Sequence, residues 1–313
     1  MSTIQTLKKE MSKVLIGREK EIDLLLIALL QEGHVLLESV PGTGKTLLAK
    51  TFSHCIEGNF KRIQFTPDVL PSDVTGIQFF NPKTQEFELR TGPVVTNVLL
   101  ADEINRATPR TQASLLEVME EKQITIDGET VSLQPPFIVV ATQNPIESQQ
   151  GTFPLPAAQL DRFLLKIPFT YPSFEEERSI LNRFKSAQPL NTVEKVMSLA
   201  DIQSLTSLVK EVHISEDIES YILQITRATR DHEWVEVGAS PRASLALLKA
   251  SQAQAFIAGR DFVRPQDVVA VAPFVLQHRV QLTIEASLTK TPEELIDRII
   301  EMSILPVEAR EAQ

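Results

Sequence analysis

The chain has 313 residues, of which 42% are hydrophobic, so it can bury a normal core and does not have the composition of a disordered protein. Its formal net charge of −10 argues against a nucleic-acid-binding surface, which needs clustered lysine and arginine. The single cysteine, Cys55, excludes an internal disulfide, and without a signal-peptide pattern or an apolar run near ~20 residues we expect a cytoplasmic protein with no membrane insertion.

The first predicted strand, at 35–37, runs into a glycine-rich turn and then into a helical stretch. Gly42 and Gly44 allow the backbone to bend tightly, so that successive N–H groups converge on phosphate oxygens at a helix N-terminus. Lys45 can reach the β- and γ-phosphates of a nucleotide, and Thr46 can offer its hydroxyl to Mg²⁺. The segment therefore predicts a phosphate-binding loop.

One position departs from the strict phosphate-loop pattern. Glycine is expected five residues before Gly44, and Ser39 stands there. A glycine-rich turn without phosphate chemistry is the alternative interpretation. The apolar strand before the turn and the helix after it favour the phosphate loop.

Short apolar runs alternate with helical patterns through the first half of the chain, which predicts a parallel sheet covered by helices. The five strands are expected at 35–37, 62–65, 98–101, 137–141 and 164–168. Two hairpins interrupt this rhythm. They are expected at 78–80 with 86–89, and at 123–126 with 129–133 around Asp127-Gly128.

After residue 171 the pattern becomes almost entirely helical. Helices are expected at about 174–186, 199–212, 215–231, 241–258, 265–278 and 291–303. Ser240 and Pro241 indicate a helix start, because a capping residue is followed by proline in the first turn. We therefore expect two domains, an α/β domain at residues 1–171 and a helical domain at residues 172–313.

Two adjacent carboxylates, Asp102 and Glu103, follow the strand expected at 98–101. An acid at the carboxyl end of a strand, on the same sheet edge as a phosphate loop, can hold Mg²⁺ directly or through water. This role suits Asp102, whereas Glu103 points elsewhere and can polarise a water for attack on the γ-phosphate. A solvated loop with two acids is the alternative, which the preceding apolar strand argues against.

Three further polar residues fit a nucleotide site. Asn144 follows another apolar strand and could hydrogen-bond the γ-phosphate or the attacking water, although Asn-Pro is equally typical of a simple turn. Arg162 could reach the γ-phosphate of a neighbouring subunit or be an ordinary surface charge. Arg242 falls in the first turn of the helix after Ser240, where a cation opposes the helix dipole unless an anion lies opposite.

Five strings closely resemble the MoxR family of AAA+ ATPases. They are T-G-P-V at 91–94, L-A-D-E-I-N-R-A at 100–107, A-T-Q-N-P-I-E at 141–147, G-T-F-P-L-P-A-A-Q-L-D-R-F at 151–163 and G-A-S-P-R-A at 238–243. The similarity spans about residues 10–305. It implies a P-loop NTPase αβα sandwich followed by an all-α lid, ATP and Mg²⁺ as ligands, and a homo-oligomeric ring, commonly a hexamer.

The resemblance also implies a role for each site residue. The Walker B glutamate, sensor 1, the arginine finger and sensor 2 correspond to Glu103, Asn144, Arg162 and Arg242. The adenine-pocket segment, the Walker A loop and the Walker B aspartate supply the nucleotide contacts Ile16, Gly17, Pro41, Gly42, Thr43, Gly44, Lys45, Thr46, Leu47 and Asp102. The metal ligands are Thr46 and Asp102, and the two hairpins match the helix-2 insert and the pre-sensor-1 hairpin.

By this resemblance the protein is a chaperone-like ATPase that remodels or matures partner complexes, often beside proteins with von Willebrand factor A domains. A nucleic-acid motor is one alternative, but residues 121–134 carry one cation against three carboxylates, a net charge of −2 where a basic hairpin is needed. A nucleotide-gated scaffold with little turnover is another, and the two adjacent carboxylates favour hydrolysis over it. Adenine is expected because no Asn-Lys-x-Asp guanine motif is present.

Overall fold

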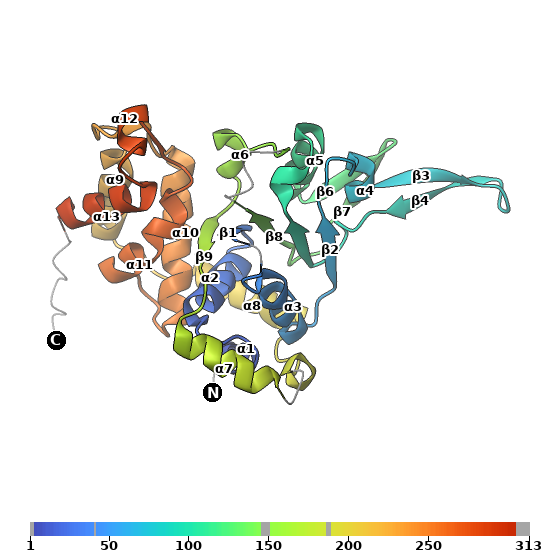
Figure 1. Cartoon of the computed structure of the whole chain (residues 1–313), viewed down its shortest axis with the longest axis horizontal. Helices are drawn as coiled ribbons and strands as arrows, with labels where there is room; N and C mark the ends of the chain where they lie inside the picture. Colours follow the sequence, from blue (N-terminus) through green and yellow to red (C-terminus); the bar gives the residue numbers. More distant parts are fainter. Residues whose placement is uncertain (1–2, 41, 145–150, 186–188, 305–313) are drawn as a thin grey trace. The chain divides into compact units, whose positions relative to one another are not determined.

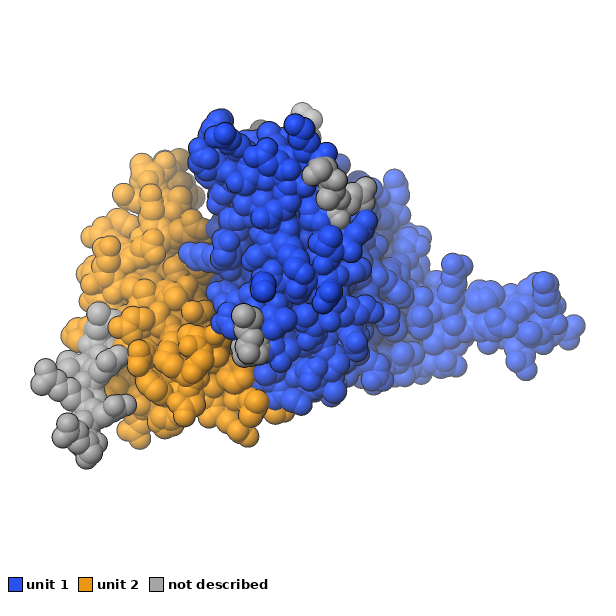
Figure 2. All heavy atoms as spheres, turned by 90° about the horizontal axis from the view of Figure 1, so that it is seen from below, with its two compact units in different colours: residues 1–205 blue, residues 206–313 orange. Residues whose placement is uncertain are grey.

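The computed structural model describes residues 3–40, 42–144, 151–185 and 189–304. The chain divides into two compact units, unit 1 at residues 1–205 and unit 2 at residues 206–313 (Figure 2). Helix α8, Leu199–Lys210, contains the point of division. None of the helices in the described ranges has both the length and the apolarity that crossing a membrane requires.

Unit 1 is built around a five-stranded sheet in which all neighbouring strands are parallel (Figure 1). Across the sheet the order is β2 (Phe60–Gln64), β5 (Val98–Asp102), β8 (Ile138–Gln143), β1 (Val35–Ser39) and β9 (Leu165–Phe169). All five strands confirm the sequence prediction. The inner strands β5 and β8 are buried almost throughout, whereas the edge strand β2 buries only Ile63. Since the strands are parallel, their carboxyl ends lie along one edge.

Helices surround this sheet, as the alternating pattern predicts. Those of unit 1 are α1 (Thr3–Ser12), α2 (Glu19–Leu30), α3 (Lys45–Cys55), α4 (Pro71–Thr75), α5 (Pro109–Glu121), α6 (Ala157–Leu160) and α7 (Phe174–Phe184), with 3-10 turns η1 (Ile104–Arg106) and η3 (Pro189–Thr192). Cys55, the last residue of α3, is buried, and this burial raises the pKa of its thiol to about 12. The cysteine therefore serves packing, as a buried apolar group.

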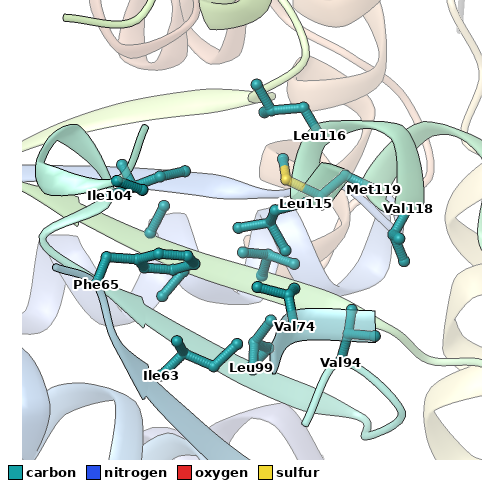
Figure 3. Packing of buried hydrophobic residues seen from close by; sticks show 14 of the residues in the cluster. Ile63, Phe65, Val74, Val94, Leu99, Ile104, Leu115, Leu116, Val118 and Met119 are labelled. Atoms are coloured by element: carbon teal, nitrogen blue, oxygen red, sulfur yellow. The ribbon is translucent and has the colours of Figure 1, made fainter. Parts of the chain in front are cut away.

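One face of the sheet packs against α4 and α5 through a continuous hydrophobic cluster. Leu99 of β5 and Val139 of β8 are fully buried in it, together with Leu115 of α5. Figure 3 shows Phe65, Leu99 and Leu115 converging on this face. Each fully buried leucine stabilises the fold by about 1.5–3 kcal/mol, so this cluster fixes the helices to the strands that carry the site.

Both predicted hairpins are present in unit 1. The first pairs β3 (Gly76–Asn81) with β4 (Glu86–Thr91), and the second pairs β6 (Gln123–Ile126) with β7 (Glu129–Ser132). The second turns at Asp127-Gly128, where both residues have positive φ, of 47° and 91°. Asp-Gly suits this turn because it tolerates two successive left-handed residues.

The β3–β4 hairpin extends away from the sheet (Figure 1). Its Phe80 and Phe87 are 51% and 71% exposed, and their ring centroids lie 5.5 Å apart in an edge-to-face contact. At its root, a β-carbon on Gly76 would lie 2.3 Å from the Arg90 carbonyl oxygen, and one on Gly92 would lie 2.2 Å from the Val74 carbonyl oxygen. The two backbone segments at the root, around Gly76 and around Gly92, are therefore in direct contact.

The segment at 172–205, which the sequence assigns to the second domain, falls within unit 1. The Arg183 Nη1 atom on α7 donates to the carbonyl oxygens of Ser12 and Lys13, at 2.6 and 2.8 Å. Further along, Glu57 donates its backbone N–H to the Met197 carbonyl oxygen at 2.9 Å. These contacts join the segment to α1 and to the end of α3, so the compact unit ends later than the change in sequence pattern at 171.

Unit 2 is helical, as predicted, with α9 (Glu216–Ala228), α10 (Pro241–Ile257), α11 (Pro265–Leu276), α12 (Ile284–Ser287) and α13 (Pro292–Met302). Ser240 occupies the N-cap of α10 and Pro241 its first turn, in agreement with the sequence. The unit also holds an antiparallel ribbon of β10 (Val235–Val237) and β11 (Gln281–Leu282). The ribbon is a small addition to the helical lid, and its strands of two or three residues leave no readable period in the sequence.

His34 is a buried histidine that joins β8 to α5. Its Nδ1 accepts from the Val139 backbone N–H at 3.0 Å, so its Nε2–H donates to the Met119 carbonyl oxygen at 3.0 Å. Burial disfavours the charged imidazole and lowers the His34 pKa from 6.5 to about 4. The neutral ring is therefore a structural element of unit 1.

The stability of the protein should fall on acidification between about pH 6.5 and pH 4. In this window the unfolded His34 binds a proton and the folded one does not, so the free energy of unfolding decreases as the pH falls, by up to roughly 3 kcal/mol. In His34→Asn the amide oxygen keeps the Val139 bond but does not titrate, so the variant should be less stable at pH 7 and less sensitive to acid. Urea unfolding at a series of pH values measures both effects, and parallel profiles for the two proteins would contradict this role.

Candidate nucleotide site

The predicted phosphate loop joins β1 to α3 at the carboxyl edge of the sheet. Gly42 and Gly44 both have positive φ, of 82° and 97°, and Lys45 is the first residue of α3. The Thr43 hydroxyl donates to the Val40 carbonyl oxygen at 3.1 Å and closes the turn. Pro41, also expected to contact nucleotide, lies outside the described residues.

The two glycines are required by backbone conformation, and the loop borders open space. A β-carbon built on Gly42 or Gly44 would meet no heavy atom within 4 Å, whereas a side chain at either φ is strained. The first N–H groups of an eleven-residue helix, α3, follow directly. A glycine-rich turn directly before a helix N-terminus is a fitting cradle for phosphate.

The carboxylate of Asp102 lies at the end of β5 and is 6% exposed. Its Oδ1 accepts from the Thr142 hydroxyl at 2.6 Å, and its Oδ2 accepts from Arg62 Nη2 at 2.7 Å. Thr142 lies on the neighbouring strand β8, and Arg62 on the opposite neighbour, β2. The aspartate is thus held from both sides of its own strand.

Glu103 follows Asp102 with a left-handed backbone, at φ 57° and ψ 48°. Its Oε2 accepts from Gln64 Nε2 and forms an ion pair with Arg106 Nε, both at 2.9 Å. Its backbone N–H donates to the same Thr142 hydroxyl, at 2.9 Å. This left-handed conformation is unusual for glutamate and makes a sharp turn of the chain directly after Asp102.

Asn144 directly follows β8, the strand between β5 and β1. It is 3% exposed, and its carbonyl oxygen accepts from Asn105 Nδ2 at 3.4 Å. The phosphate loop, the amide and the two acids therefore follow three adjacent strands. Strands in a sheet lie about 4.8 Å apart, so the outer two of these three ends are about 10 Å apart, a distance that a triphosphate can span.

The remaining candidate residues come from other elements of the chain. Ile16 and Gly17 precede α2, where Gly17 has φ 66°. Arg162 follows α6, and its Nε atom lies 2.6 Å from Glu120 Oε2 on α5. Arg242 is exposed in the first turn of α10 and belongs to unit 2. The sheet edge thus gathers the phosphate loop, Asp102, Glu103 and Asn144, whereas Arg162 precedes β9 in unit 1 and Arg242 belongs to unit 2.

Comparison with known proteins decides the family. Residues 34–165 match the model of the ATPase family associated with various cellular activities, and residues 227–299 match that of the AAA lid domain. The Chaperone MoxR1 of Mycobacterium tuberculosis is 43% identical over 95% of this chain and 81% of its own length. The chain belongs to the MoxR family of AAA+ ATPases.

Two further relatives cover nearly the whole chain. The uncharacterized protein YeaC of Bacillus subtilis is 48% identical over 96% of this chain and 94% of its own length. A crystal structure from Cytophaga hutchinsonii, described provisionally as an ATPase, is 39% identical with a TM-score of 0.90 and covers 97% and 95% of the two chains. The AAA+ fold with a helical lid therefore extends over both units.

Sequence reasoning missed several residues of this MoxR-family site. They are Arg62, Gln64, Arg106 and Thr142. Arg62 and Gln64 belong to the expected strand that pairs with β5. They are two residues apart, so their side chains lie on one face of the sheet, the face that also carries Asp102. Thr142 carries no such signal, because a threonine inside a strand is ordinary.

Gly44→Ala should weaken nucleotide binding in this MoxR-family protein. A side chain at φ 97° costs about 1–2 kcal/mol, which corresponds to about a tenfold loss of affinity if the empty loop relaxes and must return to this conformation to bind. Titration with a fluorescent ATP analogue measures the loss. Gly259→Ala in unit 2 is the matched control, because Gly259 has φ 80° and equally open space. Equal affinities for the two variants would show that the loop does not bind the nucleotide.

Proposed function

We propose that this MoxR-family protein binds and hydrolyses Mg·ATP and uses the energy to remodel partner protein complexes. The carrying observation is that the phosphate loop, the Asp102–Glu103 pair and Asn144 follow three adjacent parallel strands at one edge. The family match and the chaperone name of the Mycobacterium tuberculosis relative support the same function.

The phosphate loop binds the nucleotide in this proposal. Backbone N–H groups from Gly42 to Leu47 surround the phosphates, and Lys45 at the start of α3 neutralises their charge. Ile16 and Gly17 line the adenine side.

Thr46 and Asp102 fit a magnesium site, because a hydroxyl and a carboxylate are hard oxygen ligands. Mg²⁺ takes few ligands from proteins when phosphates and waters fill its other positions, so these two residues suffice. When bound, Mg²⁺ neutralises the β- and γ-phosphates. Arg62 now donates to Asp102 through a side chain that is 43% exposed, and it can leave for solvent without being stranded in the interior.

Glu103 is the proposed general base. Its carboxylate has partners of its own, Gln64 and Arg106, so that Asp102 can serve the metal while Glu103 serves the attacking water. Asn144 is a neutral neighbour between these acids and the phosphate loop, and its amide can orient the water without adding negative charge. The residues thus divide the work of binding, proton transfer and orientation among three strand ends.

Ring assembly completes the site in this proposal. Arg162 serves the γ-phosphate of an adjacent copy in a homo-oligomer, and a hexamer is the expected form. Its ion pair with Glu120 is partly exposed, with 30% and 36% of the two side chains accessible. Such a pair contributes at most about 1 kcal/mol, so Arg162 can leave Glu120 for a phosphate at little cost in stability. Arg242 of unit 2 reports the loss of the γ-phosphate to the lid.

The clients in this proposal are proteins, including complexes that contain a von Willebrand factor A domain. The β3–β4 hairpin exposes Phe80 and Phe87, which suits apolar contacts with a protein chain. The β6–β7 hairpin and its flanks carry a net charge of −2 over residues 121–134, which disfavours a phosphate backbone.

Glu103→Gln should abolish turnover and leave nucleotide binding intact. The amide has nearly the same shape but cannot accept a proton from water, and loss of a general base reduces kcat by about 10²–10⁴. Steady-state phosphate release and binding of a fluorescent ATP analogue measure the two properties. Equal hydrolysis by the variant and the wild type would contradict the assignment of Glu103.

Arg162→Ala should retain nucleotide binding and lose turnover by about 10³–10⁵. Because the arginine acts on a neighbouring copy, mixing Arg162→Ala with Glu103→Gln should restore part of the hydrolysis, since some interfaces then join an intact base to an intact arginine. Phosphate release across mixing ratios measures this rescue. A wild-type chain that is fully active as a monodisperse monomer would refute the shared site.

A further inference from the structure

The hydroxyl of Thr142 contacts the carboxylate of Asp102 and the backbone N–H of Glu103. Thr142 lies on β8, opposite Leu37 of β1, and is 0% exposed. Its Oγ1 lies 2.6 Å from Asp102 Oδ1 and 2.9 Å from the Glu103 backbone nitrogen. One buried oxygen on β8, the strand that Asn144 follows, thus connects that strand to Asp102 and Glu103 at the end of β5.

The donors and acceptors fix the direction of both hydrogen bonds. The Glu103 amide can only donate, so the threonine oxygen accepts from it. The one hydroxyl proton is then donated to Asp102 Oδ1, at a distance typical of a bond from a hydroxyl to a carboxylate. Rotating the hydroxyl away would leave a buried carboxylate oxygen without this donor, which is costly.

The same contact supports the unusual backbone at Glu103. A left-handed glutamate at φ 57° is less stable than an extended one and persists only where surrounding bonds hold it. Gln64 and Arg106 hold the side chain, and Thr142 holds the peptide N–H. The threonine therefore fixes the direction in which the carboxylate of Glu103 leaves the main chain.

The two oxygens of Asp102 have partners of different kinds. Oδ2 faces Arg62, a cation that is 43% exposed and that another cation can replace. Oδ1 faces the fully buried hydroxyl of Thr142, which cannot move without repacking the sheet. The threonine side of the carboxylate is thus permanent, and the arginine side is exchangeable.

We propose that Thr142 is a positioning residue that orients Asp102 toward the divalent cation and holds the Glu103 backbone in its catalytic turn. This role rests on the proposed Mg·ATP hydrolysis. Residues that orient a metal ligand contribute about tenfold to a hundredfold to metal affinity or activity. Thr142 thereby links β8, which Asn144 follows, to the proposed metal ligand Asp102 and to the proposed general base Glu103.

Thr142→Val tests the role in the full chain, because valine keeps the branched shape and removes the hydroxyl. The dissociation constant of a fluorescent ADP is measured with saturating Mg²⁺ and with EDTA. With Mg²⁺ it should rise about tenfold to a hundredfold, and with EDTA it should equal the wild-type value, since Asp102 acts through the metal. The kcat for ATP should fall as well. Thr142→Ser, which keeps the hydroxyl, should behave as the wild type.

Thr111→Val is the matched control. Thr111 is also 0% exposed, and its hydroxyl donates to the Val69 carbonyl oxygen at 2.8 Å, away from the two acids. It should lower the melting temperature without changing the effect of Mg²⁺. If Thr142→Val does not fold, Thr142→Ala, which also lacks the hydroxyl and is smaller, takes its place in the same measurements.

The possible outcomes separate this role from the function on which it rests. If Thr142→Val binds the ADP as the wild type does under both conditions and keeps its kcat, the positioning role is overturned. Equal weakening with Mg²⁺ and with EDTA also overturns it, because that result reports a general loss of structure. A wild-type chain whose ADP affinity is indifferent to Mg²⁺ and that hydrolyses no ATP overturns the proposed function and this role together.

Discussion

The parallel pairing of β5, β8 and β1 is the constraint on which the rest of the site depends. Each strand carries its own polar end, and none of these ends would form a site alone. Pairing of Leu100 with Val140, and of Leu36 with Ala141, sets the register that brings the ends level. The buried contacts of α4 and α5 beneath the sheet keep that register, because a slip would displace every apolar side chain. The position of the site residues therefore depends on the packing of the hydrophobic core.

Charge at this edge is balanced locally before any nucleotide enters. Arg62 neutralises Asp102, and Arg106 with Gln64 satisfies Glu103. On the opposite face of the sheet, Glu38 of β1 pairs with Lys166 at 2.7 Å. Exposed arginine pairs are weak and exchangeable, whereas the buried threonine contact is fixed. The edge thus combines a rigid frame with cations that a stronger ligand can displace.

The sequence predicted the elements whose signals are local. Apolar runs located the five strands, and Asp127-Gly128 located a hairpin turn. What it could not predict depends on distant partners. Arg183 attaches α7 to the carbonyl oxygens that follow α1, and no local pattern in 172–205 announces that attachment. Thr142 likewise resembles any strand threonine until its neighbour on β5 is known. The roles proposed for Arg162 and Arg242 would depend on other copies and on the second unit, which a single chain's pattern does not contain.

The root of the β3–β4 hairpin has a mechanical consequence. Gly76 and Gly92 bring two backbone segments into direct contact, so no side chain acts as a cushion between them. A hairpin held at its root by such backbone contacts would move as one unit about its junction with α4. Six residues of strand reach about 20 Å, so a tilt of about 10° at the root carries Phe80 and Phe87 through about 3 Å. Small rotations inside unit 1 would thus be amplified into large displacements at the aromatic tip.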